Sequence, residues 1–287
     1  MSQVDQFTQV IRRLPAEDRA SELTKLFDLA NSDELRHEAL VACFNLCSED
    51  VLRKQDIEPH APTILGYWRD AFERANPMQG LAEKLEWKID PDYSEVRLAA
   101  GLLLDLMSYL PIQQVESALR EGLSLTDQRL KMFAALSLLR QLQVVDPEEL
   151  EKIATSHEVR ILLWEQLRLQ NMESLMPEAW STPEMLAASE LSRWVAHPME
   201  LGTPPEEIEL MGVFPAATDA GFEDVYLFRF REYPQPWEPG EGWKAGIAGP
   251  MSNGEAIGSS WSRFENWDSR IPEEHFNKLY ESVSGCN

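Results

Sequence analysis

One short pattern recurs four times in the first part of the chain, and it constrains the fold more than any other feature. In each copy an apolar residue precedes a base, an acidic or polar residue comes before the pair, and small or apolar residues follow three or four places later. Residues at that spacing share one face of a helix, so each copy predicts a helix with one buried face. The bases are Arg36, Arg97, Lys131 and Arg160.

The distances between these bases predict a repeat. They are 61, 34 and 29 residues along the chain, and units of about 30 residues are typical of stacked helix pairs. The longest interval has room for two units, so we expect one further unit in or near residues 63–72.

The four segments resemble those of HEAT-repeat proteins, in which helix pairs stack into a curved solenoid. The resemblance covers about residues 20–180 and implies that the inner helix faces bind proteins or peptides. An acidic first turn followed by an apolar and a basic residue also begins many ordinary helices, so an irregular helical bundle is the alternative. The residues that carry the resemblance are Asp33-Glu34-Leu35-Arg36, Ser94-Glu95-Val96-Arg97, Asp127-Gln128-Arg129-Leu130-Lys131 and His157-Glu158-Val159-Arg160.

After about residue 176 prolines become frequent and the periodicity changes. A helical stretch at 184–196 is followed by four segments with strand character, at 207–214, 224–233, 243–248 and 259–265, and by a helix at 272–283. Alternation along 225–231 predicts two strand faces. The first holds Tyr226, Phe228 and Phe230, and the second holds Val225, Leu227, Arg229 and Arg231.

These patterns predict a mainly α, α+β protein with two domains. Residues 1–180 are the HEAT-like helical-repeat domain, a short solenoid. Residues 181–287 are a small α+β domain, in which a connecting helix leads to an antiparallel sheet that a C-terminal helix covers. A chain of 287 residues is long enough for two such cores.

The chain is strongly acidic, with a formal net charge of −23. Such a surface repels the phosphates of nucleic acids, so nucleic-acid binding is not expected. The charge has two explanations, which are solubility and attraction of a basic protein partner.

The sequence also predicts a cytoplasmic protein that does not enter a membrane. The longest apolar stretch, 98–110, is interrupted by Asp105, and the N-terminus lacks the features of a secretory signal. Cys43 and Cys47 lie one helical turn apart and are expected to be buried thiols. We expect no metal and no cofactor.

Aromatic residues are concentrated in the C-terminal third, which holds 13 of the 26. Core filling is the first explanation, and a binding surface rich in aromatic residues and arginine is the second. Prolines on both sides of Trp237 favour a stiff loop with this indole at its tip. The candidate partner-binding residues are Trp237, Trp243, Trp267, Arg231 and Asp268.

No pattern predicts catalysis. The residue types at 240–245 match a dinucleotide-binding motif. That motif lies between a strand and a helix, whereas here a predicted proline-rich loop precedes it and a predicted strand follows, so we reject it. His275 follows Asp268 and Ser269 closely, and closeness in sequence does not establish the geometry of a catalytic triad. We therefore predict a noncatalytic protein-interaction module, and one form of it is a bacterial immunity or inhibitor protein. The alternative is an enzyme or small-ligand-binding protein with a pocket between the helical and α+β domains.

Overall fold

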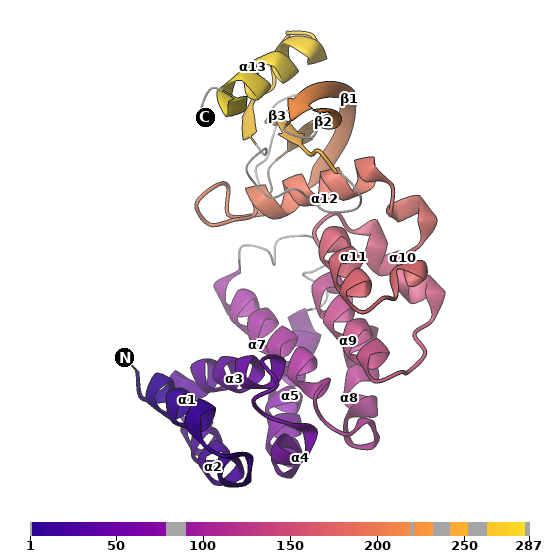
Figure 1. The fold of residues 1–287 in the computed structure, drawn as a ribbon. Helices are drawn as coiled ribbons and strands as arrows, with labels where there is room; N and C mark the ends of the chain where they lie inside the picture. Colours follow the sequence, from indigo (N-terminus) through magenta and orange to yellow (C-terminus); the bar gives the residue numbers. More distant parts are fainter. Residues whose placement is uncertain (1, 79–89, 219–220, 232–241, 252–262, 285–287) are drawn as a thin grey trace. The chain divides into compact units, whose positions relative to one another are not determined.

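The computed structural model of this chain describes residues 2–78, 90–218, 221–231, 242–251 and 263–284. The chain forms two compact units, Met1–Asp146 and Pro147–Asn287. Helices come first, and a four-stranded antiparallel sheet and a C-terminal helix end the second unit (Figure 1). The predicted fold class, mainly α and α+β, is confirmed. The domain boundary predicted at residue 180 falls inside the second unit.

The described helices of the first unit form three successive pairs, and α1 contacts both helices of the first pair. Helix α2 packs against α3, α5 against α7, and α8 against α9. The second helix of each pair also contacts the second helix of the next pair, so α7 touches both α3 and α9. The helix expected at residues 63–72 is present as part of α5, which packs against α7, and α3 also contacts α7 directly. The helices are α1 (Gln3–Arg13), α2 (Arg19–Ala30), α3 (Asp33–Ser48), α4 (Lys54–Ile57), α5 (Ala61–Ala75), α7 (Pro91–Met107), α8 (Ile112–Ser124) and α9 (Gln128–Arg140).

Helices α3, α9 and α11 (Arg160–Leu169) end in the same type of turn. The residues Asp50, Leu142 and Asn171 have left-handed backbones, with φ of 56°, 58° and 55°. After each of them an amide donates a hydrogen bond to a carbonyl five residues earlier, as in Gln143 N–H to Leu138 at 3.0 Å. This pair of features is the Schellman motif, which satisfies carbonyls that a helix end leaves free. These three helices carry Arg36, Lys131 and Arg160.

Two of the four recurrent bases make the same contact. The Nε atoms of Arg36 and Arg160 donate to the carbonyls of Ala30 and Ala154, each six residues earlier, at 3.1 and 2.7 Å. Arg97 instead donates to the Asp127 carboxylate at 2.7 Å. All four bases lie in the first two turns of a helix, from the first residue of α11 to the seventh of α7, and they do not share one type of hydrogen-bond partner.

Cys43 and Cys47 of α3 are buried, as predicted, and are 1% and 2% exposed. A hydrogen bond with Cys47 and burial raise the pKa of the Cys43 thiol well above its usual value, so it is protonated at neutral pH. Within the described ranges, no helix combines the length and the apolar character needed to cross a bilayer.

The second unit contains α10 (Pro147–Thr155), α11, α12 (Pro183–Val195), the sheet and α13 (Pro272–Ser284). The strands pair antiparallel in the order β1-β2-β3-β4. Each of the four predicted strands is present among the described residues, and the third has the predicted bounds; residues 232–233 and 259–262 of the second and fourth predictions lie outside the described residues. The strands are β1 (Glu207–Thr218), β2 (Gly221–Arg231), β3 (Trp243–Ala248) and β4 (Arg263–Asn266).

A helix covers each face of this sheet, where the sequence predicted one helix on one face (Figure 1). Tyr226, Phe228 and Phe230 pack against Leu191 and Val195 of α12. Val225 and Leu227 lie together on the opposite face, as the alternation of β2 predicted, and this face packs against α13. The buried residues of this contact are Ala216, Val225, Leu227, Ala245 and Ile247 of the sheet and Phe276 and Leu279 of α13. Burial on both faces fixes the register of β2, since a slip of one residue would exchange its two faces.

Candidate functional site

Two arginines and a tryptophan meet on the α13 side of the sheet. Residues two apart on a strand share a face, and Arg231 of β2 pairs with Trp243 of β3. The guanidinium carbons of Arg229 and Arg231 therefore lie only 4.6 and 5.1 Å from the centre of the Trp243 ring. A cation at this distance is attracted by the π electrons of the indole. The indole stays partly exposed.

Two glutamates of β1 continue the row. Glu207 pairs with Arg231 and Glu209 with Arg229 in the strand register. Arg229 donates to Glu209 Oε2 from Nε at 2.8 Å, and its other contact to the same oxygen is 2.6 Å long; Arg231 forms an ion pair with Glu207. We call the row of Glu207, Glu209, Arg229, Arg231 and Trp243 the Trp243 surface.

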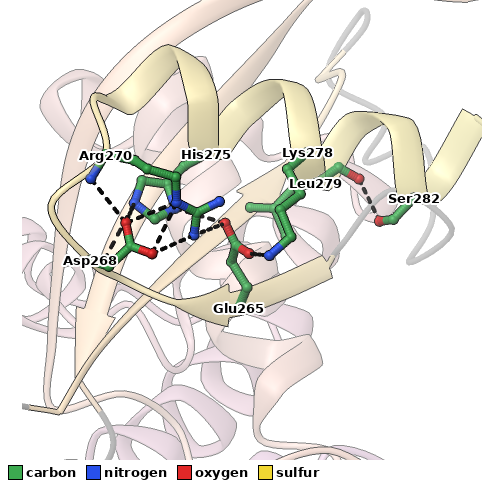
Figure 2. Close-up of polar contacts among 7 residues, drawn as sticks. All are labelled: Glu265, Asp268, Arg270, His275, Lys278, Leu279 and Ser282. Carbon is green, nitrogen blue, oxygen red and sulfur yellow. Dashed lines mark hydrogen bonds and ion pairs between the residues drawn. The ribbon is translucent and has the colours of Figure 1, made fainter.

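Figure 2 shows a second polar group, where β4 leads into α13. The fully buried His275 lies between two carboxylates, with Nδ1 2.7 Å from Glu265 and Nε2 3.4 Å from Asp268. Arg270 bridges the same carboxylates, 3.0 Å from Glu265 and 2.8 Å from Asp268. Lys278 of α13 forms a further ion pair with Glu265. We call these five residues the His275 cluster.

Trp267 connects the two groups. Its ring stacks on the His275 imidazole, with the centres 4.4 Å apart and the planes 12° apart. Its backbone N–H donates to the carbonyl of Trp243 at 2.9 Å. The Trp243 surface and the His275 cluster therefore form one continuous region along β3, β4 and the beginning of α13.

Electrostatics stabilises the charged form of both carboxylates in the cluster. Burial alone would raise the pKa of Glu265, but hydrogen bonds from Lys278 and His275 and the charge of Arg270 outweigh it and lower the pKa. Hydrogen bonds from the side chain and backbone of Arg270 lower the pKa of Asp268 from 3.8 to about 2. Both groups are therefore anionic at neutral pH, and the cluster holds its cations in place.

The lowered pKa of Asp268 predicts a pH effect on stability. A carboxylate whose pKa is lower in the folded state stabilises the fold above its unfolded pKa, and this contribution is lost as the pH falls through the folded pKa. We expect Asp268→Asn to have a lower melting temperature than the unaltered protein at pH 5. The difference should shrink as the pH falls from 3.8 toward about 2. Thermal unfolding followed by circular dichroism at several pH values measures it; a constant difference would contradict the assignment.

The structure brings together four of the five predicted binding residues. Arg231 and Trp243 lie in the Trp243 surface, Trp267 lies beside it, and the exposed Asp268 belongs to the His275 cluster. Trp237 lies outside the described residues. Trp267 also packs against the core beneath α13, so it has a structural role as well.

The sequence did not single out Glu207, Glu209 or Glu265 as members of a site. Each of these glutamates belongs to the site because it contacts a residue at least 10 positions away in the chain, as Glu265 contacts His275. Strand register and helix docking make these pairs, and the residue types along the chain carry no signal for them. Arg229 was placed on the correct face by alternation alone.

The position of His275 does not suit a catalytic base. Its side chain is fully buried, and its two ring nitrogens face Glu265 and Asp268. A general base must reach the proton that it abstracts from a substrate. This imidazole instead joins β4 to α13. Across the described ranges no three His, Cys, Asp or Glu side chains are placed to hold a metal ion.

Comparison with known proteins identifies no relative: no family model matches the chain, and neither a curated protein nor a solved structure is significantly similar to it.

Proposed function

We propose that this protein is a noncatalytic interaction module that binds another protein through the Trp243 surface. The observation that carries the proposal is the partly exposed Trp243 beneath two guanidinium groups, each fixed by a glutamate. Tryptophan and arginine are the residues most enriched among those that dominate binding energy at protein interfaces. Arginines that are already held in place lose little conformational entropy when a partner binds.

The partner in this proposal is a basic protein. The net charge of −23 raises the rate at which an oppositely charged protein meets this one. Within the Trp243 surface two glutamates face two arginines, so the long-range attraction comes from the net charge of the whole chain. A bacterial immunity or inhibitor protein of the cytoplasm, which masks a basic toxin, is one form of such a module.

The first unit would serve as a HEAT-like scaffold for the same partner. The three successive helix pairs support this view, as do the matching ends of α3 and α9. In HEAT-repeat proteins such stacked helices present an inner face to proteins or peptides. The different partner of Arg97 is the main departure from a regular repeat.

The experiment that tests the proposal is recovery of the partner with the tagged full chain from its native cells. We expect a basic protein in a fixed ratio to the chain, and we expect salt to weaken its binding because salt screens exposed charges. A bound metabolite with no protein partner would support the alternative, a small-ligand-binding protein or enzyme.

The contribution of the Trp243 surface is measured with Trp243→Ala and the recovered partner. We expect the affinity to fall at least about 30-fold, since a residue that dominates an interface contributes about 2 kcal/mol or more. The matched control is Trp164→Ala on α11, because Trp164 is also partly buried with an arginine 5.3 Å from its ring centre. Equal affinity for the two variants would contradict the proposal.

Trp237→Ala extends this test to the loop that the sequence predicts around residues 234–239. The sequence predicts that it lowers partner affinity and leaves the melting temperature unchanged. An equal fall in melting temperature would assign Trp237 to the core.

A further inference from the structure

The strand β1 lies at one edge of the sheet. Among the described strands it pairs with β2 alone. An edge strand has one row of backbone N–H and C=O groups that no neighbouring strand satisfies, and such a row can pair with an added strand. The edge is continuous with the Trp243 surface because Glu207 and Glu209 belong to both.

The first half of β1 has different chemistry on its two faces. Glu207 and Glu209 lie on the face of the Trp243 surface, and their side chains are 43% and 44% exposed. Ile208 and Leu210 lie on the other face of the sheet, where they pair with Phe230 and Phe228 of β2. Leu210 is 46% exposed. A strand added here would meet carboxylates on one face and apolar side chains on the other.

Each of the two glutamates uses one oxygen for its arginine. Both contacts from Arg229 go to Glu209 Oε2, and Arg231 contacts Glu207 Oε1. Within the described part of the chain, no hydrogen bond or ion pair involves the other oxygen of either carboxylate. A carboxylate has about four acceptor positions, so each glutamate has capacity left for a cation from a partner.

The second half of β1 is poorly suited to accept a strand. The register shifts between Leu210 and Gly212, which marks a bulge, and Pro215 has no N–H to donate. Bulges and prolines are common means of preventing strand addition at a sheet edge. The open part is therefore residues 206–210.

We propose that residues 206–210 bind an extended segment of the basic partner, which adds to the sheet beside β1. The segment alternates basic and apolar residues, so that its lysines or arginines reach Glu207 and Glu209 while its apolar side chains cover Ile208 and Leu210. Backbone hydrogen bonds provide the pairing, and the alternation provides the specificity. This inference rests on the proposed function and adds the binding mode and the chemistry of the bound segment.

The probe for this mode is a fluorescein-labelled octapeptide that alternates lysine and valine. Its matched control has the same composition with four lysines followed by four valines, so it has the same charge without the alternation. We expect saturable binding of the alternating peptide to the full chain, measured by fluorescence anisotropy, and at least about tenfold weaker binding of the control. Hydrogen exchange should slow at residues 206–210 when the alternating peptide binds.

The double variant Glu207→Gln/Glu209→Gln should weaken binding of the alternating peptide at least about tenfold, because the loss of one hydrogen bond to a charged group already weakens binding by about that factor. The control is Glu273→Gln/Glu281→Gln, which removes the same charge from exposed positions of α13. Melting temperatures establish that both variants are folded.

An equal loss of peptide affinity in the two double variants would show that only general charge attraction is at work, and so would equal affinity for the two peptides. Either result would overturn the inference. Absence of binding would also overturn it. The proposed function would still stand in these cases if a basic protein partner is recovered from native cells and Trp243→Ala weakens its binding.

Discussion

Replacing Asp127 with alanine is expected to lower the free energy of unfolding of the first unit by about 3–5 kcal/mol, the cost of leaving a buried charge without its partner. The Asp127 side chain is fully buried. It accepts hydrogen bonds from the Tyr93 hydroxyl at 2.8 Å and from Arg97 at 2.7 and 3.1 Å. It also accepts the backbone N–H groups of Arg129 and Leu130, which begin α9. One carboxylate therefore joins α7 to α9 and caps a helix.

Urea unfolding of Asp127→Ala and Asp127→Asn separates these roles. Asparagine retains an oxygen that can cap α9 but lacks the charge that faces Arg97, so we expect an intermediate loss. In the double variant Asp127→Ala/Arg97→Met, the loss should be smaller than the sum of the single losses, because no unpaired guanidinium remains. A loss below about 1 kcal/mol for Asp127→Ala would show that water replaces these hydrogen bonds, as at an exposed cap.

Replacing Arg160 with alanine is expected to destabilise the second unit by about 3 kcal/mol or more. Arg160 is 3% exposed and donates to the carbonyls of Ala154 and Thr155, both at 2.7 Å, and of Met185 at 2.9 Å. Its guanidinium also lies 4.8 Å from the centre of the Trp180 ring. Alanine would leave three carbonyls without this donor, and a buried acceptor without a hydrogen bond costs about 1–3 kcal/mol. Burial lowers the pKa of Arg160 to about 10, so it is charged at neutral pH.

Two further variants identify the cause of that loss, again by urea unfolding. Arg160→Lys should restore little stability, since a single ammonium group lacks the planar fork that reaches three carbonyls. Arg36→Ala removes the matching contact to Ala30 at 3.1 Å, but the Arg36 side chain is 34% exposed, so we expect a loss of only about 1 kcal/mol. Equal losses for Arg36→Ala and Arg160→Ala would mean that burial does not set the effect.

Local patterns in the sequence predicted most of the secondary structure. The strand β3 and the first residue of α13 lie where periodicity and turn residues placed them. The two faces of β2 are also as predicted, with Tyr226 and Phe230 on one side and Val225 and Leu227 on the other. These features depend on residues within one element, so the chain order alone contains the information.

The sequence predicted less about how the helices pack against the rest of the chain. The sequence predicts only a connecting helix at 184–196, yet Leu191 and Val195 of α12 cover one face of the sheet. The buried Ser189 of the same helix donates to the carbonyl of His157 at 2.7 Å and accepts the amide of Ile161 at 2.9 Å. Apolar periodicity indicates that a helix has a buried face, and it does not identify the element that buries it.

By itself, then, the sequence determined the elements, their order, the acidic character of the chain and the residue types available for binding. The tertiary structure alone decided which of those residues meet, as the contacts of Arg231 with Trp243 and of His275 with Glu265 demonstrate. The physical reason is that secondary structure follows from interactions between near neighbours in the chain. A binding surface depends on strand register and helix docking, which are set by burial summed over many distant residues.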